Sequence, residues 1–174
     1  MIISVKEAKE LINFNDWSEQ KIERKLKAIE QVIRTYTNNN FQQRSYRRTA
    51  DIIGSLFVAD SLIPFEVGDT VQISESELNE GLFTVKTVED ATFEVNESVK
   101  DENEVLVTKI VYPDDVIDCC INMLEWENKS RSKVGIKSET LSRHSVTYED
   151  SNSFFMGYPK GLLGCLSLYK KARC

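Results

Sequence analysis

The chain has 174 residues, of which 41% are apolar and 29% charged, with seven Gly and three Pro. This composition excludes a collagen-like, low-complexity or mainly disordered chain, and the length allows a core without metal or disulfide staples. The net charge of −6 is unlike that of a dedicated nucleic-acid binder, which is normally basic. No apolar run reaches the roughly 20 residues of a membrane span, and the first residues lack a signal-peptide core, so neither a membrane protein nor a secreted one is expected.

The charge is unevenly distributed along the chain. Residues 60–118 hold 16 acidic and 3 basic side chains, whereas residues 19–59 and 119–174 each carry a net +4. An acidic middle between two mildly basic flanks predicts that the middle forms a structural unit of its own.

Two helices are predicted at the start of the chain. Ser4 and Glu7 have the spacing of a capping box, which favours a short helix through about Ile12. A longer helix is expected to begin near Ser18, because apolar residues then recur at spacings of three and four. The recurring residues are Ile22, Leu26, Ile29, Ile33 and Tyr36. The run 37–40, Thr-Asn-Asn-Asn, should end this helix, since Asn favours caps and turns.

From about Phe41 the apolar period changes from 3.6 to 2, which is typical of strands. Turn signals at 67–69, 79–81 and 89–91 separate the alternating segments. Strands are expected at 70–74, 82–88, 92–95 and 105–111, with one more between 44 and 58. Four or five short strands over about 70 residues indicate a small antiparallel barrel or sandwich.

Helical spacing returns after Pro113, where Asp114 and Asp115 suit the positive end of a helix running to about Asn128. Residues 134–158 show no sustained period, although 145–148 could form a strand, and they are too apolar for a plain linker. We predict that this arm is loosely docked in a free subunit and becomes ordered against a neighbour. A last short helix is expected over 161–171.

The predicted fold class is therefore α+β. A helical bundle, formed by 1–40 and 113–174, is interrupted by a small antiparallel β barrel or sandwich over 41–112, and an extended C-terminal arm and terminal helix follow. Because domain insertions are tolerated where chain ends meet, the two ends of the β unit should lie close together.

Few residues point to catalysis or to a metal. His144 is the only histidine and has no evident nucleophile or orienting acid beside it. A helix start explains Asp114 and Asp115 without a metal. The four cysteines, at 119, 120, 165 and 174, have no zinc-site spacing and fit free thiols in a reducing compartment. We therefore expect no enzyme, no metal and no cofactor.

The clearest basic cluster is Arg44-Ser45-Tyr46-Arg47-Arg48. Arginines interleaved with an aromatic residue could follow phosphates and stack a base, which makes an OB-like module binding single-stranded nucleic acid one interpretation. The acidity of the surrounding β unit opposes that interpretation. The other interpretation is that these arginines pair with an acidic surface of another subunit.

The C-terminal part contains two short motifs. One is the serine-rich segment 138–148, which ends in Ser-Val-Thr-Tyr, and the other is the segment 158–173, which reads Tyr-Pro-Lys-Gly-Leu-Leu and ends in Tyr-Lys-Lys-Ala-Arg. Their order resembles the end of the head–tail connector (adaptor) proteins of long-tailed phages. Residues 5–9, Val-Lys-Glu-Ala-Lys, and the following helix are similar to the opening helices of that family. The resemblance covers about residues 4–40 and 113–173, and the β insertion departs from the simplest members.

The resemblance implies a structural virion protein rather than an enzyme. Its expected partners are further copies of itself in a ring, commonly of twelve, the portal protein above, a tail-side connector protein below, and double-stranded DNA that passes without sequence-specific binding. No membrane is involved, and the expected location is the virion, with the host cytoplasm during assembly. The candidate subunit or portal interface residues are Arg44, Arg47, Arg48, Val146, Tyr148, Phe154, Phe155, Tyr158, Pro159, Leu162, Leu166, Tyr169, Lys170, Lys171 and Arg173. The basic clusters are expected to face protein partners rather than DNA, because tight phosphate contacts would hinder DNA passage.

Overall fold

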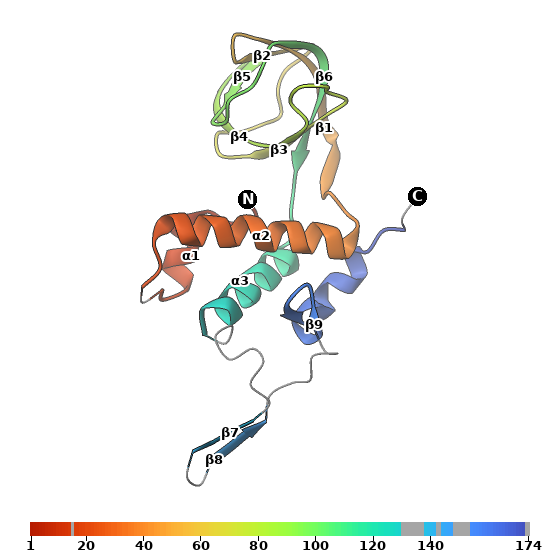
Figure 1. Cartoon of the computed structure of the whole chain (residues 1–174). Helices are drawn as coiled ribbons and strands as arrows, with labels where there is room; N and C mark the ends of the chain where they lie inside the picture. Colours follow the sequence, from red (N-terminus) through yellow and green to blue (C-terminus); the bar gives the residue numbers. More distant parts are fainter. Residues whose placement is uncertain (15, 130–137, 142–143, 148–153, 173–174) are drawn as a thin grey trace. The chain divides into compact units, whose positions relative to one another are not determined.

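A computed structural model describes residues 1–14, 16–129, 138–141, 144–147 and 154–172. The chain forms two compact units, drawn in Figure 1: a helical unit of residues 1–39 and 112–174, and a barrel unit of residues 40–111. The boundaries expected from the sequence differ from these by one residue.

The helical unit begins with two capped helices. The first, α1 (Val5–Leu11), follows Ser4, whose side chain accepts a hydrogen bond from the Glu7 amide, while the Glu7 carboxylate accepts one from the Ser4 amide. This confirms the predicted capping box. The second helix, α2 (Glu19–Thr37), is capped by the Ser18 side chain and ends at Asn38, which has a left-handed backbone.

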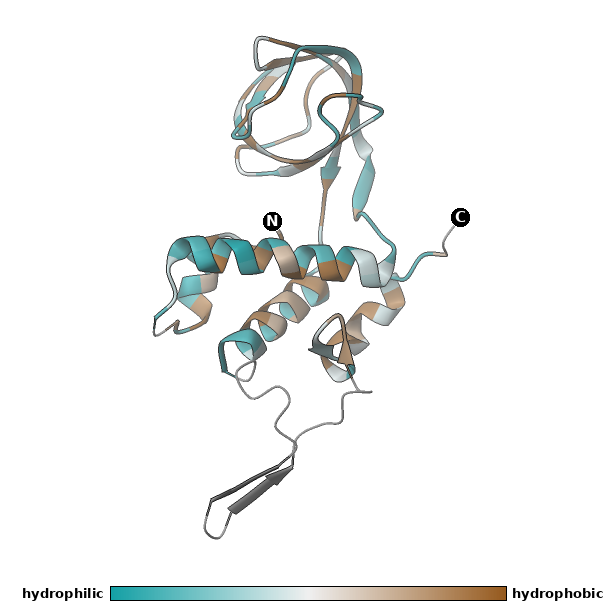
Figure 2. Cartoon of the chain, viewed as in Figure 1, coloured by the Kyte–Doolittle hydropathy of each residue, from teal (hydrophilic) through white to brown (hydrophobic). Residues whose placement is uncertain are grey.

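The third helix, α3 (Asp114–Lys129), packs on α2, and Figure 2 shows hydrophobic and hydrophilic residues sharing each of these two helices. Their apolar sides meet in the core of the helical unit, as amphipathic helices require. The fully buried side chains there include Ile22, Leu26, Ile29, Ile33, Met123, Leu124, Leu163 and Leu166.

The end of the chain contains short elements. Two two-stranded sheets occur, one of β7 (Ser138–Leu141) with β8 (His144–Thr147), the other of β9 (Phe154–Phe155) with β10 (Tyr158–Pro159). The last helix, η3 (Lys160–Tyr169), has 3₁₀ geometry. Leu163 and Leu166 are buried in it and Tyr169 is half-buried, a spacing of three that matches three residues per turn.

The barrel unit is a closed antiparallel barrel of six strands in the order β1-β2-β5-β4-β3-β6. Its strands are β1 (Gln42–Ile53), β2 (Leu56–Ala59), β3 (Thr70–Ser74), β4 (Gly81–Glu89), β5 (Thr92–Val95) and β6 (Glu102–Ile110). Strands β3 and β5 have the predicted bounds, and β4 and β6 lie within three residues of theirs.

The first two strands occupy the segment predicted to hold one strand. Gly54 and Ser55 both have positive φ, at 57° and 79°, and they turn the chain between β1 and β2. A two-residue hairpin turn with positive φ at both central positions matches the twist of its strands. The Gly-Ser turn therefore divides this segment into two strands, which the alternation of apolar residues alone did not show.

The barrel core is apolar and aromatic. Phe57 and Phe93 stack inside it with ring centroids 4.4 Å apart, and Phe65 meets Phe93 edge to face. Gln42 pairs with Ile110, and the Val111 amide donates to the Phe41 carbonyl at 3.0 Å. The two ends of this unit therefore lie side by side.

The expected fold class is wrong. An antiparallel barrel is present, but the chain is a mixed α/β fold with four helices in its described part, not a helical bundle carrying a small insertion. One helix has only seven residues, the last is a 3₁₀ helix, and Figure 1 shows α3 running obliquely to α2. Periodicity identifies an amphipathic helix but contains no information on its crossing angle.

Candidate functional site

Three arginines lie along the first half of β1 and form what we call the arginine strip: Arg44, Arg47 and Arg48. The register of β1 against β6 shifts between Gln42 and Arg47: β1 advances by five residues there, while β6 advances by two, from Ile110 to Thr108. This irregular stretch turns Arg44 and Tyr46 outward, and both are exposed. The local departure from strand pairing therefore makes Arg44 and Tyr46 accessible, whereas Arg47 and Arg48 are half-buried.

Two members of the strip are positioned by neutral groups. Arg47 Nε donates to the Thr108 hydroxyl at 3.0 Å, and Arg48 Nε donates to the Leu62 carbonyl at 2.8 Å. No ion pair joins any of the three arginines to a carboxylate among the described residues. Their positive charge is therefore not neutralised within the barrel.

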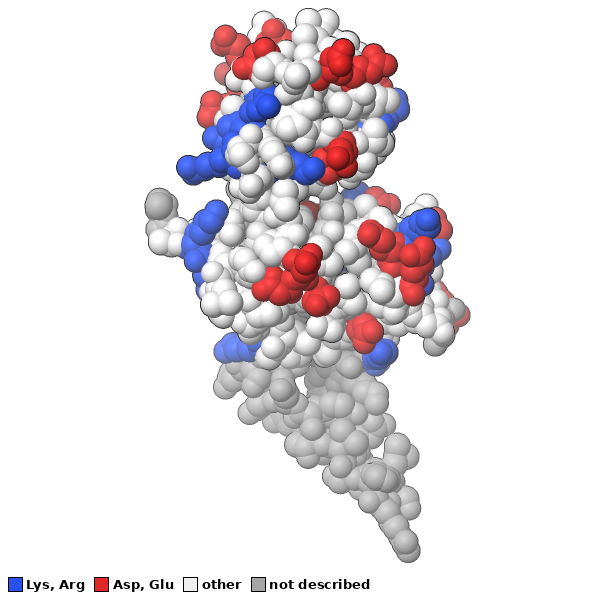
Figure 3. All heavy atoms as spheres, turned by 180° about the vertical axis from the view of Figure 1, so that it is seen from behind, with Lys and Arg blue, Asp and Glu red and all other residues white. Residues whose placement is uncertain are grey.

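The rest of the barrel unit is acidic. Residues 40–111 contain fourteen acidic and six basic side chains, a net charge of −8. Figure 3 shows several Lys and Arg side chains near one another on the barrel, with Asp and Glu side chains both beside them and elsewhere on the face in view. A basic cluster on a unit of net negative charge suits steering toward a partner of opposite charge.

Tyr46 lies within the arginine strip. It is 40% exposed, and the Lys109 ammonium lies 5.7 Å from the centre of its ring. Lys109 also pairs with Asp69 at 2.6 Å, so it adds little net charge. Tyrosine and arginine side by side on a surface are the residue types enriched at the energetic centres of interfaces.

The C-terminal candidates divide into buried and exposed residues. Tyr158 and Leu166 are buried within the helical unit, which removes them from the candidate interface residues. The ring of Phe155 packs edge to face on Tyr36, and the ring of Phe154 lies tilted against Trp126 with ring centroids 6.1 Å apart. The end of the predicted arm is therefore docked on the chain's own helices, because its aromatic side chains find partners there.

Tyr158 reaches a buried charged group that sequence reasoning missed. Its hydroxyl donates to Glu127 at 2.7 Å, and Lys25 donates to the same carboxylate at 2.8 Å. The Glu127 side chain is only 2% exposed, so both partners are needed to offset its desolvation. These contacts join α2, α3 and β10. In the sequence, the only indication that Glu127 is buried was its spacing from the apolar residues of the buried face of α3.

The final candidates lie at the surface. Pro159, Leu162 and Tyr169 are half-buried, whereas Lys170 and Lys171 are exposed. The Tyr169 hydroxyl donates to the Asp115 carboxylate at 2.6 Å, which gives that predicted helix-start acid a partner. The Lys170 ammonium lies 3.8 Å from the centre of the Tyr36 ring.

The asparagines after α2 also bind this segment. Asn38 Nδ2 donates to the Ala172 carbonyl at 2.9 Å, and Asn39 Nδ2 donates to the Tyr169 carbonyl at 3.2 Å. The Lys171 amide donates to the Thr37 carbonyl at 2.8 Å. The sequence suggested only that these residues end a helix. Their second role depends on contacts with residues about 130 positions away.

Two candidates, Tyr148 and Arg173, lie outside the described residues. Val146 is in β8, where it pairs with Glu139 of β7. Sequence reasoning placed a strand at 145–148, and β8 spans His144–Thr147. The partner strand β7 was not predicted.

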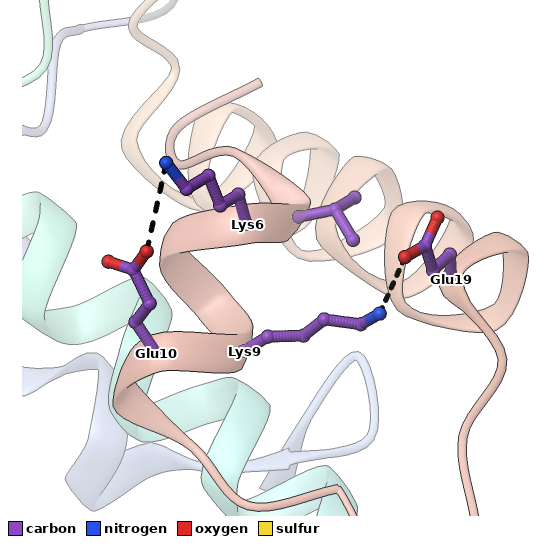
Figure 4. A pocket seen from close by; sticks show the side chains of 5 residues that line it. Lys6, Lys9, Glu10 and Glu19 are labelled. Carbon is purple, nitrogen blue, oxygen red and sulfur yellow. Dashed lines mark hydrogen bonds and ion pairs between the residues drawn. The ribbon is translucent and has the colours of Figure 1, made fainter.

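A surface hollow of about 430 Å³ lies beside α1 and the start of α2 (Figure 4). Its charged side chains pair with one another: Lys9 with Glu19 at 2.6 Å, and Lys6 with Glu10 at 4.0 Å. The Lys9 ammonium lowers the pKa of Glu19. With its charges mutually neutralised, this hollow has no charge to offer a ligand.

The described part of the chain contains three cysteines, none of them in a disulfide. Cys119 and Cys120 are buried and Cys165 is exposed, all as free thiols. Within the described ranges, no three His, Cys, Asp or Glu side chains come together as a metal site. Over those same ranges, no helix has the length and apolarity to cross a membrane.

No family model matches the chain, and no curated protein matches it.

Proposed function

We propose that this chain is a structural subunit of a phage virion, a head–tail connector that forms a ring beneath the portal and continues the DNA channel toward the tail. The two segments that resemble this family, 4–40 and 113–173, come together in one compact unit. The barrel, which lies between these two segments in the sequence, forms a separate unit. Contacts among α2, α3 and η3 explain why the family-like segments fold together although they are far apart in sequence.

The observation that carries the proposal is the β7–β8 hairpin. Among the described residues it forms a sheet of only two strands, so each strand has one edge without a sheet partner there. An isolated two-stranded hairpin is marginally stable in water, and open strand edges pair readily with other chains. A neighbouring subunit or the portal would supply the missing surface, as a ring subunit requires.

The charge of the barrel supports passage of DNA without a tight grip. A unit of net charge −8 repels phosphates. Because each phosphate contact strengthens binding to DNA, a unit that makes few of them lets DNA slide. The same charge opposes the alternative function, an OB-like module for single-stranded nucleic acid. The barrel also has six strands, whereas an OB-fold has five.

The test is the mass of the purified full chain, measured alone and with its portal by native mass spectrometry. We expect a closed ring of many copies on the portal. A chain that stays monomeric with the portal and binds single strands with a steep salt dependence would overturn the proposal in favour of the OB-like module.

A matched pair of variants tests the part played by the hairpin. Thr140 lies within β7 and faces Ser145 in the register. Thr140→Pro removes a backbone donor and should abolish ring formation, whereas Thr140→Ala keeps the donor and should not. Circular dichroism must show that both variants retain the fold of the remaining chain. Equal ring formation by the two variants would contradict a hairpin-mediated contact.

A further inference from the structure

We infer that the barrel contains two complementary patches through which copies of this chain contact one another head to tail. The arginine strip with Tyr46 on one copy binds an apolar outer face of β1 and β2 on the next. The inference rests on the proposed function, since it assigns the barrel a place in the ring, but it can fail separately.

The apolar face consists of Ile53, Leu56 and Val58, which are 60%, 37% and 39% exposed. Ile53 pairs directly with Leu56 across the hairpin, and Val58 lies two residues farther along β2 on the same side. Directly paired side chains lie about 5 Å apart, so the three form one continuous surface. Three exposed aliphatic side chains in contact form a small apolar patch that a partner can cover.

One side of the rim of this face is acidic. In the register, Asp51 lies opposite Val58, and Glu94 lies opposite Leu56 on the neighbouring strand β5. Because paired residues point to the same side of a sheet, both carboxylates border the apolar face. Glu94 is already paired with Lys86 at 3.0 Å, so Asp51 supplies the uncompensated negative charge of the rim. A matching partner needs an apolar centre flanked by positive charge.

The arginine strip with Tyr46 has that chemistry. Tyr46 offers an exposed ring, while Arg44 is exposed and makes no ion pair among the described residues. Arg47, beside Tyr46, is equally without a carboxylate partner there. Nucleic acid fits the pair of patches less well, since it would leave the apolar face uncovered and approach an acidic unit.

One copy cannot satisfy both patches by itself. Tyr46 and Ile53 lie seven residues apart on the same strand, which corresponds to about 23 Å at the usual strand rise. The contact therefore joins the strip of one copy to the apolar face of another. Made head to tail, such contacts repeat around a ring when the rotation closes, whereas the reciprocal arrangement would close a dimer and give no ladder of cross-linked products.

The test is position-specific cross-linking of the full chain with a short bismaleimide. The background carries Cys165→Ser and Cys174→Ser. Copies with Ser45→Cys are mixed with copies carrying Ser55→Cys. Both serines are exposed and lie next to the patches, so the side chains of the patches themselves are kept. We expect cross-linked dimers from the mixture only, and a ladder of larger products when one chain carries both substitutions. Lys100→Cys, at another exposed position of the barrel, replaces Ser55→Cys as the matched control.

Charge exchange adds a second readout. Arg44→Glu should lower the yield of the 45–55 product at least threefold, and adding Asp51→Lys to the same chain should restore it, because the charges of Arg44 and Asp51 are then exchanged. Lys100→Glu, an equal charge change elsewhere, should leave the yield unaltered. A 45–55 yield no higher than the 45–100 yield, in the free protein and on the portal, would overturn the inference.

The outcomes separate the inference from the proposed function. A ring on the portal without the 45–55 product leaves the connector function standing and refutes the barrel contact. The 45–55 product in a chain that never forms a ring on the portal supports the barrel contact and refutes the connector function.

Discussion

Single side chains organise the loops of the barrel, and Glu102 shows how. Its carboxylate accepts hydrogen bonds from the Ser76 hydroxyl, the Glu77 amide and the Asn79 side chain, at 2.6 to 2.8 Å. The Ser76 hydrogen bond is the main cause of the lowered pKa of Glu102. A carboxylate that accepts several hydrogen bonds favours its charged form.

The lowered pKa leads to a pH prediction. A depressed folded-state pKa stabilises the barrel above the unfolded Glu value of about 4.3, and this contribution is lost as the pH falls through the lower folded value. We expect the amide signal of Glu77 to titrate with a midpoint below that of an ordinary Glu in NMR spectra. Ser76→Ala should move the midpoint upward. A midpoint that Ser76→Ala leaves unchanged would contradict this cause.

The three described cysteines should differ in reactivity. Burial raises the pKa of Cys120 to about 12 and raises that of Cys119 as well, so few thiolates form at neutral pH. Cys165 is exposed. In a Cys174→Ser background, we expect a maleimide at pH 7.5 to label one thiol rapidly, identified as Cys165 by peptide mass spectrometry. Labelling of the other two should require unfolding in urea, and rapid labelling of either would contradict their burial.

At the scale of elements, the end of α2 holds the end of the chain. Asn38 combines a left-handed backbone (φ 48°) with hydrogen bonds from its side chain to the carbonyls of Lys171 and Ala172. Asn tolerates this conformation better than other residues with a Cβ, while Gly adopts it freely. Helix termination and docking of the last segment therefore depend on one residue.

Two substitutions of Asn38 separate these roles. Asn38→Gly removes the side-chain hydrogen bonds but keeps the backbone conformation accessible. Asn38→Ala loses the same bonds and adds left-handed strain of roughly 1–2 kcal/mol. Urea unfolding followed by Trp17 and Trp126 fluorescence, both in the helical unit, should show Asn38→Ala to be the less stable by about 1 kcal/mol. Equal stabilities would indicate that the backbone conformation relaxes.

At the scale of the whole molecule, the barrel is a unit whose first and last residues lie next to each other. The hydrogen bond between Val111 and Phe41 and the pairing of Gln42 with Ile110 close it at its own boundary. Its core is formed by residues of its own strands, from Ala50 to Val107, and by Phe65 of the segment between β2 and β3. A unit with its own core and adjoining termini has what independent folding requires.

We therefore expect residues 40–111 to fold when expressed alone. The fragment should give a β-type circular dichroism spectrum, dispersed amide signals and a cooperative thermal transition. A fragment lacking the β1–β6 pairing, residues 54–111, is the control and should not fold, because removing β1 opens the barrel. Disorder of the complete fragment would show that the barrel depends on the helical unit.

Local sequence patterns determined the elements of this protein. The capping box at Ser4, the stripe from Ile22 to Tyr36 and the alternation at 70–74 depend on backbone periods that neighbouring residues set by themselves, and the structure has elements there. The acidic middle and the basic 44–48 cluster were also evident from composition. The patterns did not show that Gly54 and Ser55 turn the chain or that the last helix is 3₁₀.

Only the tertiary structure decided which elements meet. Closure of the barrel through β1 and β6, burial of Tyr158 against Glu127 and the hold of Asn38 on the chain end join residues 31 to 134 positions apart. Such contacts depend on how side chains pack and on whether buried polar groups find hydrogen-bond partners. The periodicity of neighbouring residues contains no information on either. For the same reason the predicted bundle was wrong: helix periodicity specifies an apolar face, whereas the angle at which two faces cross depends on the side chains that interlock between them.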